Sequence, residues 1–238
     1  MFQKNEIDPM ALILSIETST TVCSVALHRE GQLLCIFELH EENAHAGKLM
    51  LLIEDLFKRS GFGPKDLQAV AVSAGPGSYT GLRIGVSLAK GFSYAQNIPL
   101  IGVDALEALA VRALPFCSPK DVVIPMLDAR RMEIYTSVIS GDGSVIAPSH
   151  PLVVEDNPFE NYLSKGKVFF LGDGLPKLKH VLGHSQAVFL SIFNSAISVG
   201  ELAFEKFKKG QFEDVAYFEP NYLKDFRVIP SKKNPLLL

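Results

Sequence analysis

A glycine-rich segment, GPGSYTG at 75–81, is the first stretch whose residue types could do chemistry. Glycines let backbone N–H groups approach an anion, and the N-terminus of a following helix favours negative charge. The spacing matches neither a P-loop nor a nucleophile elbow. Two interpretations therefore stay open. In one, Gly75, Gly77 and Ser78 form a degenerate phosphate cradle. In the other, the segment is a tight strand-to-helix turn with Ser78 or Thr80 as helix cap.

The histidines and cysteines give no signature of a metal site. His40 and His45 are five residues apart in an expected loop, and a glycine separates His180 from His184. A zinc site needs three or four convergent ligands, usually at a clear spacing. The three cysteines are widely spaced and form neither a disulfide framework nor a CxxC pair. We therefore expect surface histidines, no metal and no nucleophile–base pair.

One row of the helix expected after the glycine-rich segment is small throughout. The row comprises Gly81, Gly85, Ala89 and Ser93. Two glycines cost about 1 kcal/mol each inside a helix, and a smooth row permits closer helix packing than the usual 8–10 Å. The row could pack within its own lobe or against a helix of another subunit. In the preceding helix, 46–59, Met50 and Phe57 lie outside the main apolar stripe, which suits an exposed contact.

Alternating strands and helices must position these residues. The first half predicts strands at 11–17, 22–28 and 32–39, a helix at 46–59, a strand at 69–73, a helix at 82–95 and a strand at 98–103. A helix at 104–114 leads to strands at 122–128, 133–140 and 144–150, a helix near 158–164, a strand at 168–172, a helix near 175–182, a strand at 187–191 and a last helix at 195–209.

Each half therefore has the order strand-strand-strand-helix-strand-helix-strand. This repeat predicts an α/β fold of two similar lobes, the plan of the actin-like ATPase (ribonuclease H-like) superfamily. Because the last helix often returns to the first lobe in such folds, we assign 10–103 plus about 196–228 to lobe one and 104–195 to lobe two. We expect residues 1–9 to be a disordered extension and Met10 to be the native start.

Two turns stand where ATPases of this plan carry Asp-x-Gly. They are ETST at 17–20 and DARR at 128–131. Ser19 and Arg130 occupy the glycine positions, and a side chain there crowds a phosphate. We expect Asp128 to be ion-paired in a structural turn and ATP hydrolysis to be inefficient. The candidate degenerate nucleotide cleft comprises Thr18, Gly75, Gly77, Ser78 and Asp128.

Composition excludes several classes of protein. The chain has 238 residues, 47% of them apolar, and a net charge of −3. It can therefore fill a core, and its charge is not that of a protein with a broad basic face for nucleic acid. No apolar run reaches the roughly 18–20 residues of a membrane helix, and the N-terminus has no secretory signal pattern. A cytoplasmic protein is expected. The cations of the tail at 221–233, such as Lys224, could touch phosphates, but solvated cations are the favoured interpretation.

Several segments closely resemble the bacterial TsaB (YeaZ) family. They are ILSIETSTTVCSVAL, AGPGSYTGLRIGVSLAKG, GVDALEALA, DARRMEIYTSV and the late PNYLK. The resemblance runs from about residue 11 to 228. It implies the two-lobed actin-like fold and a non-catalytic paralogue of TsaD, the subunit that transfers a threonylcarbamoyl group to N6 of adenosine next to the tRNA anticodon.

The resemblance also implies partners. Members pair with TsaD through two first-lobe helices, here about 46–59 and 81–95, and form homodimers through much the same surface when alone. The ATPase TsaE joins the pair, and contact with tRNA is indirect, through the complex. No cofactor, metal or membrane is implied, with weak nucleotide binding left open. The predicted partner interface comprises Met50, Phe57, Gly81, Gly85, Ala89 and Ser93.

The sequence departs from the family where His45-Ala46-Gly47 replaces a frequent His-Ser-Glu, which weakens the expected helix cap. The favoured hypothesis is a non-enzymatic scaffold that supports TsaD. A rival is an ATP-dependent small-molecule kinase of the same fold, which would need an intact carboxylate-plus-glycine phosphate site. A second rival, a metalloprotease suggested by the older glycoprotease-like label, would need bound zinc.

Overall fold

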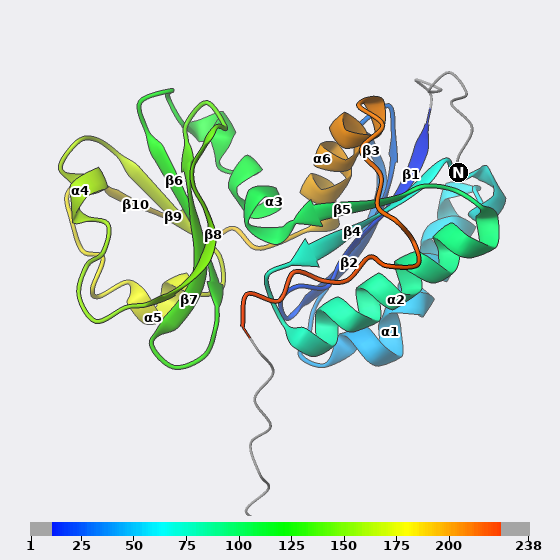
Figure 1. Cartoon of the computed structure of the whole chain (residues 1–238), viewed down its shortest axis with the longest axis horizontal. Helices are drawn as coiled ribbons and strands as arrows, with labels where there is room; N and C mark the ends of the chain where they lie inside the picture. The colour runs from blue at the N-terminus through cyan, green and yellow to red at the C-terminus, as the bar shows by residue number, and fades with distance from the viewer. Residues whose placement is uncertain (1–10, 225–238) are drawn as a thin grey trace, which may run out of the picture.

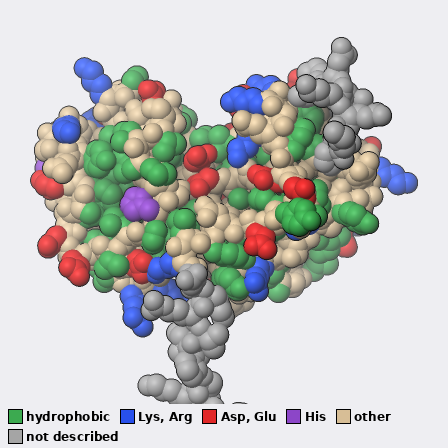
Figure 2. All heavy atoms as spheres, in the orientation of Figure 1, with side chains coloured by type: hydrophobic (Ala, Val, Ile, Leu, Met, Phe, Trp, Pro, Cys, Tyr) green, Lys and Arg blue, Asp and Glu red, His purple; other side chains and the backbone are tan. Residues whose placement is uncertain are grey.

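The computed structural model describes residues 11–224 and shows two five-stranded sheets, each with helices packed against it (Figure 1). The extension predicted at 1–9 and the end of the chain, 225–238, lie outside the described residues. A notch separates the two lobes on the face shown in Figure 2.

The first sheet has the strand order β3-β2-β1-β4-β5. Its strands are β1 Leu12–Glu17, β2 Val22–Arg29, β3 Gln32–His40, β4 Ala69–Gly75 and β5 Leu100–Asp104. The first three form an antiparallel meander, whereas β4 runs parallel to β1 and β5 parallel to β4. Every residue of β1 is buried, as its continuous apolar run predicts for a central strand. The carboxyl ends of β1 and β4 therefore lie side by side and bring the first turn next to the glycine-rich loop.

Helices cover both faces of this sheet. Helices α1 Ala44–Ser60 and α2 Tyr79–Gln96 pack on one face, and α6 Ala196–Lys208 packs on the other. Alternation along β1 divides the core accordingly, because Leu12 and Leu14 face α1 and α2 whereas Ile13 faces α6. The last helix thus packs on the first sheet, although it follows the strands of the second.

The second sheet repeats the plan, with the order β10-β9-β6-β7-β8. Its strands are β6 Val122–Asp128, β7 Glu133–Ser140, β8 Val145–Val153, β9 Val168–Leu171 and β10 Ala187–Leu190. The remaining helices are α3 Ala105–Val111, α4 Glu160–Leu163 and α5 Leu175–Leu178, with 3₁₀ turns η1 Pro64–Asp66 and η2 Leu114–Phe116. The predicted element order and the α/β, actin-like architecture are confirmed. The exact division into domains stays a prediction.

Most boundaries agree with the sequence to within a few residues, and two differences have local causes. Helix α3 ends at Val111 and a 3₁₀ turn follows at 114–116, because Pro115 has no N–H to donate to the Val111 carbonyl and its ring would clash with that group. Helix α1 starts at Ala44, after Asn43 in a left-handed conformation that makes no side-chain cap hydrogen bond. Among residues 11–224 no helix is long and apolar enough to cross a membrane.

Candidate functional site

The glycine-rich loop packs against the first turn instead of facing an open phosphate site. The Ser78 N–H donates to the Ser19 carbonyl oxygen at 2.6 Å, so this amide is already used within the protein. The Ser78 hydroxyl accepts from the Gly81 N–H at 3.3 Å and caps α2. A β-carbon at Gly77 would overlap the Ser19 carbonyl. The interpretation as a capped strand-to-helix turn therefore accounts for the loop's geometry, and close packing accounts for Gly77.

The chain after α6 covers the loop from outside. We call residues 213–224 the C-terminal strap. The Asn221 N–H donates to the Ala74 carbonyl at 2.7 Å, and a β-carbon at Gly75 would lie only 2.8 Å from the Asn221 carbonyl oxygen. The Tyr222 ring lies 4.8 Å from the Tyr79 ring. Nothing in the sequence periodicity signals the strap, because it contains neither helix nor extended strand.

The strap continues from lobe one to lobe two, as the orange and red segment of Figure 1 shows. The Lys90 ammonium of α2 donates to the carbonyl oxygens of Ala216 and Phe218, both at 3.1 Å. At the far end, Lys224 forms an ion pair with Glu133 of β7. The prediction that Lys224 is a solvated terminal cation is therefore wrong.

Asp128 is engaged in its own lobe. Its Oδ1 accepts from the Arg130 N–H at 2.7 Å and from the Lys177 ammonium at 2.5 Å. The predicted ion-paired turn is confirmed, but the partner is Lys177 of α5 and not a neighbouring arginine. Arg130 takes a left-handed backbone (φ 67°) at the position where a glycine would admit a phosphate.

Glu17, the acid of the ETST turn, is a functional candidate that was not among the predicted site residues. Its carboxyl group is fully buried, and burial raises its pKa despite polar contacts with Ser19, Ser73 and Asn194. The Ser19 N–H donates to Oε1 at 2.5 Å, whereas Oε2 has no hydrogen-bond partner among the described residues. Asn194 also donates to the Ala105 carbonyl at 2.9 Å. The signal in the sequence is an acid at the end of a strand that is apolar except for Ser15.

The histidines are only partly where the sequence placed them. His40 is exposed, as predicted, but His45 lies buried in the first turn of α1, and burial lowers its pKa. His28 is also buried, and desolvation lowers its pKa to about 4. Within residues 11–224 no three histidine, cysteine or acidic side chains come together as a metal site would require.

Comparison with known proteins shows which proteins this chain resembles. Residues 40–153 match the family model of TsaD, the tRNA N6-adenosine threonylcarbamoyltransferase. The tRNA threonylcarbamoyladenosine biosynthesis protein TsaB of Bacillus subtilis (strain 168) is 36% identical over 126 residues, 53% of this chain and 54% of that protein. TsaB of Escherichia coli (strain K12) is 37% identical over 123 residues, 52% of either chain. The chain thus spans about half the length of the curated relatives it matches.

The structural comparison covers more of the molecule. A crystal structure from Pseudomonas aeruginosa, described as similar to peptidase YEAZ, superimposes with a TM-score of 0.80. It is 27% identical and is matched over 90% of this chain and 100% of its own. The chain is thus similar in sequence to TsaB proteins over about half of their length, and similar in structure to a YeaZ-like protein over the whole of that protein. The similarity to TsaD in 40–153 agrees with a paralogous relationship between the two families.

The interface that the TsaB/YeaZ resemblance predicted is mostly inaccessible in this monomer. Gly81, Gly85, Ala89 and Ser93 are all buried in their own lobe. Thr18 fills the space beside the first two, since a β-carbon at Gly81 would overlap its carbonyl and one at Gly85 its hydroxyl. Phe57 is also buried and packs against Phe92, with ring centroids 6.3 Å apart. The prediction that this small row faces a partner is therefore wrong.

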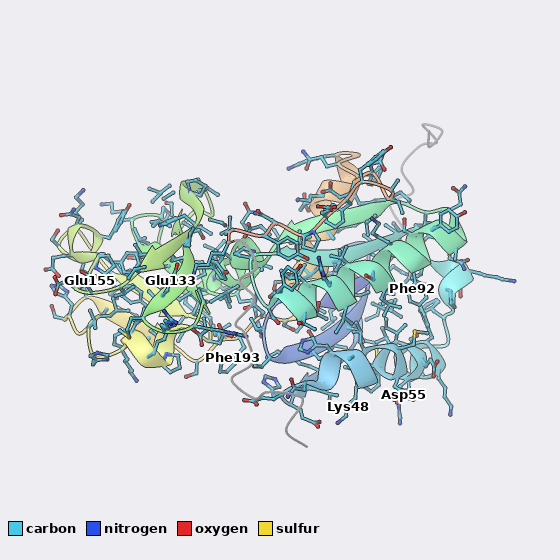
Figure 3. The ribbon with its side chains drawn as sticks, turned by 60° about the horizontal axis from the view of Figure 1, so that its bottom comes forward. Lys48, Asp55, Phe92, Glu133, Glu155 and Phe193 are labelled. Atoms are coloured by element: carbon cyan, nitrogen blue, oxygen red, sulfur yellow. The ribbon has the colours of Figure 1, made fainter. Side chains whose placement is uncertain are left out.

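A different face of the same two helices is open, and we call it the outer α1/α2 face. It comprises Gly47, Met50, Leu51 and Glu54 of α1 with Ile84, Leu88, Gly91 and Tyr94 of α2. Met50 is 43% exposed, and a β-carbon at Gly47 or Gly91 would meet nothing within 4 Å. In Figure 3, α1 and α2 lie side by side, with Phe92 near the seam and Lys48 on the opposite side of α1. Of the predicted interface residues, Met50 is the one that the structure leaves open.

Proposed function

We propose that this chain, like the TsaB proteins that it resembles, is a subunit in the synthesis of N6-threonylcarbamoyladenosine in tRNA, and that it is non-catalytic. It binds TsaD and holds it in an active arrangement, and TsaE joins the pair. The observation that carries the proposal is an open apolar face on α1 and α2, in a chain whose relatives are named for this pathway.

The outer α1/α2 face has the properties of a helix-packing surface. Met50 and Leu51 are exposed, whereas Ile84 and Leu88 are only partly covered by their own lobe. Gly47 and Gly91 leave room for a second helix to approach closely. Covering exposed apolar area of this kind gives about 25 cal/mol per Å². A helix pair from TsaD, or from a second copy of this chain, would bury the face in a helical bundle.

The contacts of the nucleotide cleft support a non-catalytic role. The Ser78 amide and the Asp128 carboxylate are engaged by other parts of the chain, and the Asn221 carbonyl lies against Gly75. The rival kinase function needs these groups to be free for phosphate and Mg²⁺. Isothermal titration with Mg-ATP separates the two functions, because micromolar binding with turnover would support the kinase.

The interface is tested by co-purification with TsaD of the same organism and by an assay of tRNA modification with TsaE present. Met50→Glu places a charge on the apolar face, and Gly91→Leu fills the gap in it. Both should abolish the complex and the modification while leaving the fold intact. Val145→Glu, at a residue 50% exposed on lobe two, is the matched control. Normal complex formation by both interface variants would refute the proposal.

A further inference from the structure

Lobe two carries a surface hollow lined by lysines. The outer α1/α2 face lies on the other lobe. The hollow measures about 620 Å³ and lies among the turns before β6, β9 and β10. Its lining includes Phe116, Lys120, Asp121, Lys165, Lys167 and Gln186. Figure 2 shows Lys and Arg side chains along the upper edge of this lobe.

The charge of the hollow is positive. Lys120, Lys165 and Lys167 come from two separate turns, and none of them forms an ion pair with an acidic side chain in the described part of the chain. The lining contains one carboxylate, Asp121, which accepts from the Ser118 N–H at 2.7 Å. Like charges that converge without counter-ions repel one another, so an anion placed among them relieves that repulsion.

An aromatic ring stands beside the lysines. Phe116 is 65% exposed at the end of η2. An exposed phenyl ring next to several ammonium groups is the combination that single-stranded nucleic-acid sites use, with bases stacked on the ring and phosphates held by the cations. A site that binds phosphate alone has no use for an aromatic ring. The presence of Phe116 therefore favours a ligand that carries bases as well as phosphates.

The turns that carry these side chains are held firmly. The Asp121 N–H donates to the Ser118 carbonyl at 3.0 Å, and the Gly141 N–H donates to the Asp121 carbonyl at 2.8 Å. The Lys165 N–H donates to the Tyr162 carbonyl at 3.0 Å. The Val122 N–H donates to the Lys167 carbonyl at 3.0 Å and ties the two lysine-bearing turns together. The backbone positions of the lysines are thus fixed before any ligand binds.

We propose that this hollow binds an unpaired stretch of RNA, with Lys120, Lys165 and Lys167 on consecutive phosphates and Phe116 stacked on a base. The net charge of −3 excludes a broad basic face, but a local site of three lysines is compatible with it. The choice of RNA over another polyanion rests on the proposed function. It also departs from the expectation that tRNA contact is only indirect.

The test is fluorescence anisotropy of a labelled single-stranded RNA oligonucleotide with the isolated full chain. Changing all three lysines to glutamine should weaken binding at least about tenfold at low salt. It should also reduce the slope of log affinity against log salt by about two, since each phosphate contact contributes about 0.7. Phe116→Ala should weaken binding about tenfold without changing the slope.

The control changes three exposed lysines elsewhere, Lys58, Lys65 and Lys209, to glutamine and so removes the same charge. Circular dichroism verifies the fold, and single-lysine variants replace the triple one if it unfolds. Equal losses in the control, tighter binding of duplex than of single-stranded RNA, or no RNA binding would each overturn the proposal. Because TsaD co-purification does not depend on this hollow, such a failure leaves the proposed function to its own test.

Discussion

Glu17 is the side chain whose chemistry depends most on its surroundings. It lies at the carboxyl end of β1, where parallel sheets of this kind meet their ligands, yet it is fully buried. Its Oε2 and the Asn194 Oδ1 both have no hydrogen-bond partner among the described residues. A protonated carboxyl group could donate to such an acceptor, whereas a carboxylate could not. The surroundings thus favour the neutral acid, in agreement with the raised pKa.

This protonation state predicts how stability depends on pH. The pKa of Glu17 is raised above its ordinary value of 4.5, so the folded state keeps the proton to a higher pH than the unfolded state. The contribution of the Glu17 proton to the free energy of unfolding is therefore complete below pH 4.5. It is lost as the pH rises through the pKa that Glu17 has in the folded state. Relative to Glu17→Gln, the wild type should lose free energy of unfolding as pH rises, by at most about 1.4 kcal/mol per pH unit.

Urea denaturation at a series of pH values measures this difference. Glu54→Gln, on the exposed side of α1, removes a charge without touching the buried cluster and serves as control. Parallel curves for the wild type and Glu17→Gln across neutral and mildly acidic pH would show that the acid is ionised in the folded state.

At the scale of elements, the two sides of α2 predict opposite effects of the same substitution. A β-carbon at Gly85 would overlap the Thr18 hydroxyl, whereas one at Gly91 meets nothing within 4 Å. Gly85→Ala should therefore destabilise the protein by about 1–3 kcal/mol through overpacking. Gly91→Ala should stabilise it by up to about 1 kcal/mol through helix propensity. Thermal denaturation of both variants provides the comparison, and a stabilising Gly85→Ala would contradict the packing described here.

The same helix shows what sequence alone can and cannot predict. Apolar periodicity predicts that helix α2 exists, and the capping Ser78 predicts where it starts. The order of the other helices and strands is predicted in the same way. Its orientation did not follow, because small residues occur both on the buried row of Gly85 and Ala89 and on the exposed row of Ser87 and Gly91. Only the position of Thr18, more than 60 residues away along the chain, decides between the rows.

The polar cluster around Glu17 could not be predicted from the sequence for a related reason. Glu17, Ser73 and Asn194 come from three distant segments, and no spacing pattern links them to one another. The strap lacks periodicity altogether, so its contacts with the loop at Gly75 could be found only from the folded chain. Periodic elements are therefore predictable, and the polar contacts between their ends are not.

At the scale of the whole molecule, three segments connect the lobes. The chain passes from β5 into α3 and returns from β10 into α6, and the strap adds a third connection through Lys224 and Glu133. Asn194, on the returning segment, donates to the Ala105 carbonyl at the start of α3 and so joins the first two. The strap is held by two backbone hydrogen bonds, from the Glu213 and Asn221 N–H groups, and by side-chain contacts such as those of Lys90 and Tyr222.

Lys90 is the residue whose removal should release the strap. Its ammonium donates to the carbonyl oxygens of Ala216 and Phe218, and Lys90→Met keeps the apolar stem while removing both hydrogen bonds. Hydrogen bonds to a charged group contribute about 1.5–3 kcal/mol each when buried, and less at this partly exposed site. We expect the opening free energy of the strap to fall by about 1–2 kcal/mol, so that its amides exchange roughly 5–30 times faster. The Asn221 amide, which is bonded to the Ala74 carbonyl, reports this change in hydrogen–deuterium exchange.

The control is Lys58→Met on α1, which should leave the exchange rate of the Asn221 amide unchanged. If Lys90→Met also leaves that rate unchanged, then the strap is held without Lys90, by contacts such as the Tyr222 ring contact and the Lys224 ion pair.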